Sequence, residues 1–329
     1  MNRPLKKVSD FVVKELAFVL ETRPCELPNR VNALLAALTD ETLQQARTSN
    51  LMLALMDLKF LEAGITHSVG AEKIPPRLLN LIHMLCPRDY SPVLTYHDLI
   101  EVNPADTRET RCFMTGNIGV TERFFYERHR RVEVVLERIL EILEEQVTDI
   151  HKICNLDEMA RIANQLGDMT DGHFNLIRRY FGKLPHRDYE GASGAHTFRL
   201  PLLEVAMWGS WLPSDYREEI ERKLIYYPQG GQWRLKKALQ EADKGQACKD
   251  LVLNGRNPSA YQGLVQLAHA IDHFRTAHIL AVRKQIPEVM RNRAPGTSGN
   301  TAAGRFLSKR QADMAAVLQQ LEGAFAEAA

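Results

Sequence analysis

The sequence predicts an all-α protein, a bundle of many helices without a substantial sheet. Apolar residues recur at three- and four-residue spacing along most of the chain, which is the periodicity of an amphipathic helix. Strict alternation of apolar and polar residues, which would indicate strands, never runs long enough to build a sheet. The chain has 329 residues, 45% apolar and 25% charged, so it can bury a large core.

The clearest helix is expected near residues 132–147. Its apolar side chains form one stripe, and glutamates occupy the rest of the circumference. The stripe consists of Val132, Val135, Leu136, Ile139, Leu140, Leu143 and Val147. Further helices are predicted near residues 5–22, 41–64, 155–181, 214–225, 257–292 and 305–326. The best strand candidate is the short segment 111–115.

Proline and glycine clusters mark the breaks between these helices. They fall at residues 75–76, 87–92, 182–194, 228–231 and 295–304. Only the segment 182–194 resembles an internal boundary. We interpret it as a functional loop between helices of a single domain that spans residues 1–329.

Charge and cysteine content narrow the class of protein. Lys and Arg total 42 against 41 Asp and Glu, so the net charge of +1 favours neither nucleic acid nor an anionic membrane as a partner. A small or neutral partner is expected instead. Five scattered cysteines indicate a reducing compartment, and no stretch approaches about 20 apolar residues. The sequence therefore predicts a cytoplasmic protein without a membrane span.

Familiar catalytic motifs are missing from the sequence. It contains no GxSxG, Walker A, GxGxxG, HExxH or HxE…PCxxC pattern. This argues against the common hydrolases, P-loop enzymes, Rossmann enzymes and zinc deaminases. There is also no CxxCH, so any haem would be held without a covalent link.

The predicted helix 269–285 carries three histidines. His269 and His273 share a face, whereas His278 lies roughly 180° and 140° round the helix from them. The three therefore cannot form one metal site on this helix alone. His278 instead projects from an apolar face, among Ile271, Phe274, Ala281 and Val282.

Two interpretations of His278 remain open from the residues alone. A histidine on an apolar face is more often a hydrogen-bonded core residue than a ligand. The alternative is an axial ligand of haem iron, because a porphyrin needs a flat apolar wall such as Phe274 would provide. Arg275, one turn earlier, would then pair with a haem propionate.

A loop rich in small residues follows this helix. Gly296, Thr297, Ser298 and Gly299 offer backbone amides and hydroxyls on a chain free to adopt positive φ. Such a loop would close over a substrate and bind its carboxylate. A plain flexible connection is the competing interpretation.

A second Gly-rich turn, at residues 191–194, leads into an apolar helix expected to begin near Phe198. His196 and Arg199 lie at the start of this element. We take His196 as a candidate for proton transfer and Arg199 as a candidate for binding an anionic group of the substrate. Alternatively, His196 caps a turn and Arg199 faces water.

These residues resemble a known superfamily. The segment HFRTAHILAVRKQIPEVMRNRAPGTSGNTAAGRFL is similar to the C-terminal part of the tryptophan 2,3-dioxygenase superfamily, in which a helical histidine binds haem iron and a GTGGS-like loop follows. His278 matches that histidine, and residues 296–299 match the loop. Three further stretches, PLLEVAMWGS, EVNPADTRETRCFMTG and LALMDLKFLEAGITHS, extend the resemblance over most of the chain. The closer likeness is to the branch of monodechloroaminopyrrolnitrin synthase, a ring-rearranging haem enzyme of pyrrolnitrin biosynthesis.

The resemblance implies a multi-helix bundle of the indoleamine/tryptophan 2,3-dioxygenase-like type that encloses haem b. His278 would ligate the iron, with Phe274 and Arg275 beside the cofactor. The implied reaction passes oxygen from O₂ or peroxide to an aromatic amino acid, a tryptophan or tyrosine derivative, and oxidises or rearranges its ring. Such chemistry belongs to specialised metabolism, for example antibiotic biosynthesis. Related folds often assemble into homo-oligomers, which we retain as an option.

The chain departs from the dioxygenases at two positions. Pro201 stands where the superfamily's substrate-binding arginine would fall, which leaves Arg199 as a shifted substitute. No histidine within residues 51–64 supplies the distal residue, and His67 lies after Gly64. These departures favour the pyrrolnitrin-type branch or a related aromatic hydroxylase. A haem-binding sensor and a cofactor-free helical interaction protein are the alternatives without turnover.

Overall fold

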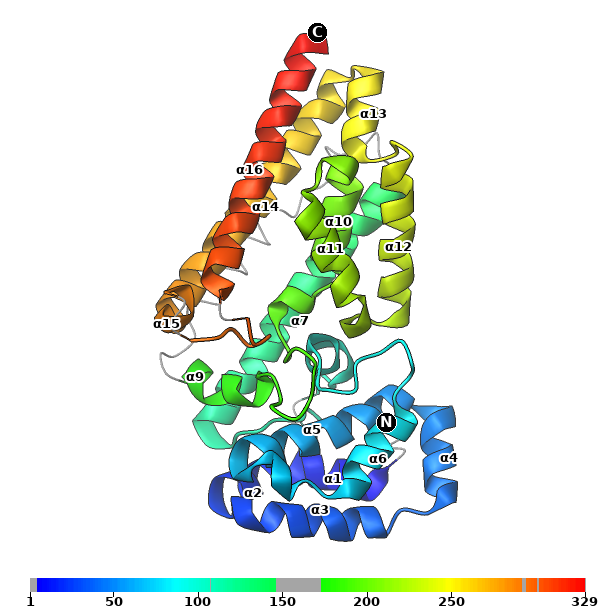
Figure 1. Ribbon diagram of the computed structural model, residues 1–329, viewed down its shortest axis with the longest axis vertical. Helices are drawn as coiled ribbons and strands as arrows, with labels where there is room; N and C mark the ends of the chain where they lie inside the picture. Colours follow the sequence, from blue (N-terminus) through cyan, green and yellow to red (C-terminus); the bar gives the residue numbers. More distant parts are fainter. Residues whose placement is uncertain (1–4, 107, 146–172, 292–293, 301, 329) are drawn as a thin grey trace. The chain divides into compact units, whose positions relative to one another are not determined.

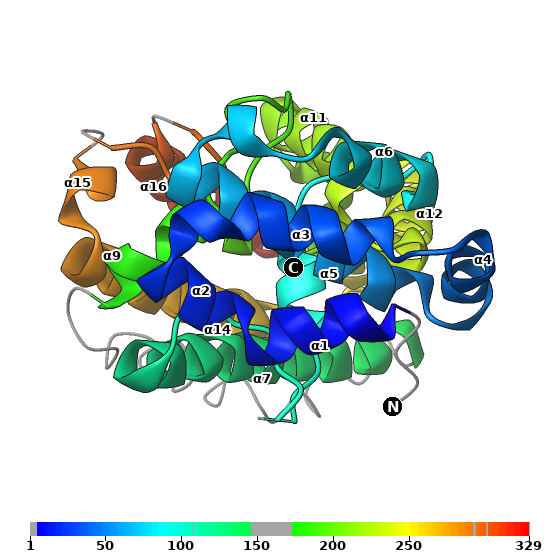
Figure 2. The same ribbon diagram turned by 90° about the horizontal axis from the view of Figure 1, so that it is seen from below.

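The computed structural model describes residues 5–106, 108–145, 173–291, 294–300 and 302–328 (Figures 1 and 2). Every regular element within these residues is a helix, which confirms the all-α class. None of the described helices is long and apolar enough to cross a membrane.

The chain divides into two compact units. The first comprises Met1–Glu127, Met169–His196 and Gly296–Asn300, and the second comprises Arg128–Asp168, Thr197–Pro295 and Thr301–Ala329. That the whole chain acts as a single catalytic domain stays a prediction.

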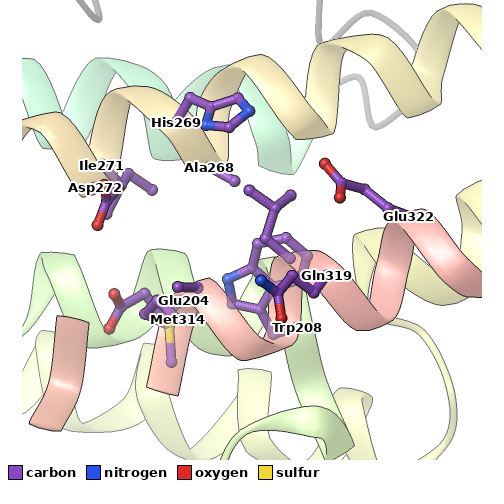
Figure 3. A pocket seen from close by; sticks show the side chains of 11 residues that line it. Glu204, Trp208, Ala268, His269, Ile271, Asp272, Met314, Gln319 and Glu322 are labelled. Carbon is purple, nitrogen blue, oxygen red and sulfur yellow. The ribbon is translucent and has the colours of Figure 1, made fainter. Parts of the chain in front are cut away.

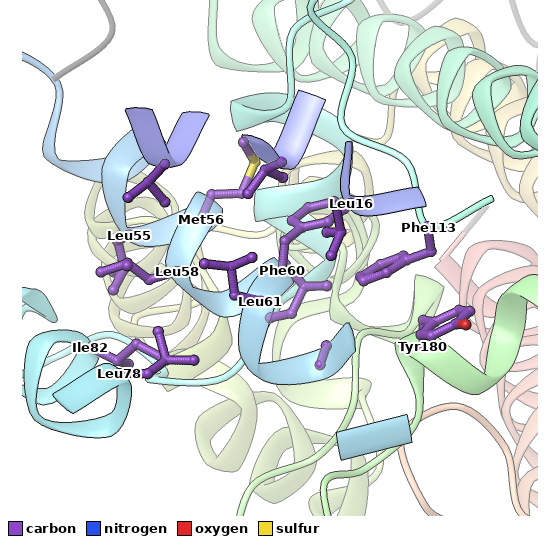
Figure 4. Close-up of a cluster of buried hydrophobic side chains, with 14 of the residues drawn as sticks. Leu16, Leu55, Met56, Leu58, Phe60, Leu61, Leu78, Ile82, Phe113 and Tyr180 are labelled. Carbon is purple, nitrogen blue, oxygen red and sulfur yellow. The ribbon is translucent and has the colours of Figure 1, made fainter. Parts of the chain in front are cut away.

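The first unit is built around α5 (Leu51–Val69). Five helices contact it: α1 (Lys6–Lys14), α2 (Leu16–Thr22), α3 (Leu27–Ala36), α4 (Asp40–Ser49) and α6 (Pro76–Leu85). Every residue from Leu53 to Thr66 is buried, so α5 is covered on all sides. Leu55, Leu58 and Phe60 project from it into the apolar cluster drawn in Figure 4.

Short elements and one aromatic stack complete the first unit. The rings of Phe60 and Phe113 lie 4.6 Å apart, and that of Tyr180 lies 4.5 Å beyond Phe113, nearly parallel (Figure 4). The stack joins α5 to a loop at Phe113 and to a short helical turn at Tyr180, both far away in the sequence. The remaining elements are η1 (Pro24–Glu26), η2 (Ala71–Lys73), the π-helical turn η3 (Asp98–Val102), the first part of α7 (Gly116–Glu145), α9 (His173–Arg178), η5 (Arg179–Phe181) and η6 (Gly194–His196).

The second unit combines two long helices with a group of shorter ones (Figure 1). The long pair, α14 (Pro258–Gln285) and α16 (Ala303–Ala328), pack on each other, and stacked rings of Tyr261 and Phe325 join them at a centroid distance of 4.0 Å. The other elements are the rest of α7, α10 (Arg199–Trp208), η7 (Gly209–Trp211), α11 (Ser214–Lys223), η8 (Leu224–Tyr226), α12 (Gln229–Asp243), α13 (Cys248–Gly255) and α15 (Pro287–Met290).

Most predicted helices are present, but their boundaries differ. The segment 5–22 forms α1 and α2, and the segment 41–64 forms α4 and α5, which meet at Asn50. Asn50 caps α5, because its side chain accepts the amide proton of Leu53. The segment 257–292 breaks before Pro287, which cannot continue a helix. Of the helix predicted at 155–181, residues 155–172 lie outside the described residues. Four further helices, α3, α6, α12 and α13, were not predicted.

The strand expected at residues 111–115 is wrong. The carboxylate of Glu122 accepts the backbone amide protons of Phe113 and Met114, and the carboxylate of Glu21 accepts that of Thr115. Side chains therefore satisfy the backbone groups that a neighbouring strand would otherwise pair.

Candidate functional site

The long helix α14 positions His278 in the second unit. Asn257 caps its start by accepting the amide protons of Ser259 and Ala260, and Pro258 occupies the first helical position. Phe274 and other apolar residues of one face are buried, whereas His269 and His273 are exposed. The helix therefore separates His278 from the other two histidines, as the spacing predicts.

His278 is half-buried and neutral. The ring of Phe274 meets it edge-on, with centroids 6.4 Å apart. Burial lowers the pKa of His278 below its usual value, and the charge of Arg275 lowers it further. Within the described residues its imidazole has no hydrogen-bond partner. Within this part of the chain nothing occupies the lone pair that a metal ligand requires, and which of the two interpretations of His278 holds stays a prediction.

Arg275 is engaged inside the second unit. Its guanidinium forms an ion pair with Glu204 of α10 and donates to the backbone carbonyl of Arg310 on α16 at 2.9 Å. Glu204 is fully buried and also accepts the hydroxyl proton of Tyr216. This network holds α10, α11, α14 and α16 together. The contact between Arg275 and a haem propionate stays a prediction, and it would have to compete with Glu204.

Arg199 forms ion pairs with two glutamates of α7. Its Nη1 lies 2.9 Å from Glu133 and its Nε lies 2.6 Å from Glu137. Glu137 also receives Arg234 at 2.6 Å. The side chain is only 14% exposed, so the alternative in which Arg199 faces water is wrong. A substrate carboxylate would have to displace one of these glutamates.

His196 lies in the first unit and is buried. Its Nε2 is 2.9 Å from the Glu190 carboxylate, and its backbone amide donates to Ser193 in the η6 turn. A buried histidine and carboxylate in contact can hold and transfer a proton. The sequence analysis did not identify Glu190 as this partner.

The loop 296–300 is a turn closed by its own backbone. The Gly296 amide donates to the Asn300 carbonyl and the Gly299 amide donates to the Gly296 carbonyl, each at 2.9 Å. Gly299 has φ +88°, a conformation that favours glycine. Of the four predicted loop amides, those of Thr297 and Ser298 therefore remain for a ligand.

The two predicted Gly-rich segments lie against each other in the first unit. A Cβ added to Gly191 would come within 2.3 Å of the Thr297 carbonyl oxygen, so only glycine permits this approach. The structure thus brings the loop 296–300 beside the segment 182–194. It places Phe274, Arg275, His278 and Arg199 in the second unit.

One buried polar group in the first unit was missed by the sequence analysis. Oε1 of Glu62, on the fully covered part of α5, lies 2.8 Å from both His186 Nε2 and Arg187 Nε. Its Oε2 and Nη2 of Arg187 are buried without a partner among the described residues. The signal was visible as a charged residue inside the apolar run LALMDLKFLEAGI, but its partners are more than 120 positions away.

A metal held by several side chains is not indicated. The described residues contain no group of three or more His, Cys, Asp or Glu that could hold a metal ion. Haem iron is different, because one axial histidine can attach it.

The second unit contains a cavity of about 260 Å³ between α10, α14 and α16. It lies beside His269 and Asp272, and His278 is not among its lining residues. Ligand pockets are commonly about 300–1,000 Å³. This cavity is therefore suited to a small molecule and not to a porphyrin.

The chain matches no protein-family model, and no curated protein matches it. The proposals below therefore depend on the residues and their geometry, together with the resemblance of the motifs.

Proposed function

We propose that the protein is a haem-b-dependent oxygenase that acts on an aromatic amino acid, with His278 as the iron ligand. The observation that carries the proposal is the state of this imidazole: half-buried, neutral and without a hydrogen-bond partner in the described part of the chain. A polar ring in that state needs a partner that the described residues do not supply. The resemblance of residues 273–307 to the dioxygenase superfamily supports iron as that partner.

The residues fit haem in part. His278 would hold the iron, and the Phe274 ring beside it is the kind of flat apolar neighbour that a macrocycle packs against. Arg275 fits the propionate role less well, because Glu204 already neutralises its charge. When bound, the haem supplies the activation of O₂ or peroxide, and the polypeptide orients the substrate and excludes water.

The other predicted site residues would bind the substrate or transfer a proton. The Thr297 and Ser298 amides are candidates for its carboxylate, and Arg199 is the second candidate once it leaves a glutamate. The proton shared between His196 and Glu190 is a candidate for transfer during turnover. The substrate class we propose is a tryptophan or tyrosine derivative of specialised metabolism.

Haem reconstitution of the His278→Ala variant tests the proposal. The wild-type protein is expected to bind haem with the Soret band of an axial histidine complex, and His278→Ala is expected to lose that ligation. His273→Ala is the matched control, because His273 lies on the same helix but is exposed. A full Soret band with unchanged ligation in His278→Ala would refute the assignment.

A turnover assay separates an oxygenase from its alternatives. The reconstituted protein is incubated with tryptophan or tyrosine and with O₂ or peroxide, and the product mass is determined. A gain of one or two oxygen atoms, or a rearranged ring, supports the oxygenase. Haem binding without turnover of either amino acid indicates a sensor. If no haem absorption spectrum develops when haem is added, the protein is neither a haem oxygenase nor a haem sensor.

A further inference from the structure

The cavity in the second unit has features of a ligand site (Figure 3). Its walls come from three helices: α10 contributes Trp208, α14 contributes Ile271, and α16 contributes Met314 and Leu318. These side chains make the inner wall apolar and aromatic. Polar residues gather on its other sides, among them His269, Asp272, Gln319 and Glu322.

The volume of the cavity selects small ligands. A buried apolar cavity of about 150 Å³ is large enough to bind benzene. At about 260 Å³, this cavity has room for one aromatic ring and a short side chain. It is open on one side toward the exposed residues His269 and Glu322, so a ligand can enter without a rearrangement of the helices.

A tryptophan ring lines the cavity. Trp208 is only 2% exposed, and Figure 3 shows its indole among the lining side chains. A ligand in the cavity would therefore contact the face of an aromatic ring.

The charges around the cavity favour a cation. Glu204 is already neutralised by Arg275 and Tyr216, but Asp272 and Glu322 have no ion-pair partner in the described part of the chain. No lysine or arginine lines the cavity. Figure 3 shows Asp272 and Glu322 at opposite ends of the group of lining side chains, so an ammonium group would gain from one of these carboxylates.

We infer that this cavity binds a small amine with an apolar body, such as a single-ring arylalkylamine. The ring lies against Trp208, Ile271 and Met314, and the ammonium group lies at Asp272 or at Glu322. His278 does not line this site: it is six residues, about 9 Å, farther along α14 than Asp272, the nearest lining residue on that helix. The inference does not depend on haem binding.

Calorimetric titration of the full-length protein, without added haem, tests this inference. The probes are 2-phenylethylamine, 2-phenylethanol and phenylacetate, which share a ring and differ in charge. The amine is expected to bind most tightly and the acid most weakly, and the preference should decrease as salt is raised. Equal affinity for all three probes, a preference for phenylacetate, or no binding of the amine at millimolar concentration would overturn the inference.

Variants locate the site. Asp272→Asn or Glu322→Gln, whichever removes the carboxylate that holds the ammonium group, is expected to weaken amine binding by about two- to fivefold, the range of a partly exposed ion pair, and to leave binding of 2-phenylethanol unchanged. Glu327→Gln is the matched control, because Glu327 is exposed on α16 but does not line the cavity. Ala315→Leu fills the cavity and should remove binding of both probes. Unchanged amine affinity in both carboxylate variants would overturn the assignment.

His278→Ala distinguishes this inference from the proposed function. It is expected to lose haem ligation and to bind 2-phenylethylamine with unchanged affinity. If amine binding were lost together with haem ligation, the cavity would belong to the haem site and the separate amine site would be refuted.

Discussion

The central helices of the two units hold their polar side chains differently. In the first unit, α5 is covered on all sides and carries three buried ionisable residues, each in an ion pair: Asp57 with Arg111, Lys59 with Asp98, and Glu62 with Arg187. In the second unit, α14 carries one such pair, Arg275 with Glu204, and also His278, which has no hydrogen-bond partner in the described residues. The ion pairs hold loops and helices to α5 and α14, whereas the imidazole of His278 is left for the ligation that we propose.

The buried ion pairs of α5 are expected to be essential for the stability of the first unit. Arg111→Ala leaves the carboxylate of Asp57 buried without its partner, and this should cost about 3–5 kcal/mol of stability. Urea denaturation measures the loss. The control is Lys6→Ala, which removes an exposed pair with Asp10 and should cost about 1 kcal/mol or less. Equal effects of the two variants would refute the structural role of the α5 pairs.

Glu122 tests whether a buried carboxylate without an ion pair in the described residues destabilises the first unit. Burial raises the pKa of Glu122 from 4.5 to about 7, although Tyr126 and two backbone amides donate to it. Between pH 4.5 and about pH 7, Glu122 is protonated in more of the folded molecules than of the unfolded ones. The stabilising contribution of protonated Glu122 is therefore complete below about pH 4.5 and is lost as pH rises through about 7.

The expected loss from Glu122 across this interval is about 3 kcal/mol. Urea denaturation of the wild-type protein at pH 4.5, 6 and 8 should show it, after comparison with Glu122→Gln, which cannot titrate. The same pH dependence in wild type and variant would show that Glu122 does not titrate in this range.

His278→Ala is expected to have the smallest effect on stability. His278 stabilises the fold through no hydrogen bond, so His278→Ala should change stability at pH 8 by about 1 kcal/mol or less. Because the pKa of His278 is lowered in the folded state, its neutral form is favoured there, and wild-type stability should fall as pH drops below about 6.5. The variant should lose this part of the acid sensitivity. A large loss at pH 8 would show a structural histidine.

Sequence periodicity predicted on which face of a helix a side chain lies, but not which distant residue it contacts. The spacing around His278 correctly separated it from His269 and His273, because helical geometry fixes directions within one helix. It could not show that Glu204, 71 positions earlier, pairs with Arg275. The same holds for Glu62 and Arg187.

Helix boundaries and short helices were also hard to predict. The 15-residue helix α12 begins at Gln229, inside the segment 228–231 that was predicted as a break, and the 8-residue helix α13 lies in a segment without a predicted helix. The segment 111–115 looks like a short strand because three apolar residues follow one another at 112–114, yet the carboxylate of Glu122 accepts the amide protons of two of them. Such contacts are decided by tertiary structure, which local propensity does not report.

The stacked rings of Phe60, Phe113 and Tyr180 give the first unit its own optical reporter. The three tryptophans, at positions 208, 211 and 233, all belong to the second unit. Tryptophan emission excited at the red edge therefore follows only one half of the molecule, while near-ultraviolet circular dichroism includes the signal of the stack in the other half. A single melting experiment with both detectors reveals whether the halves denature together or one after the other.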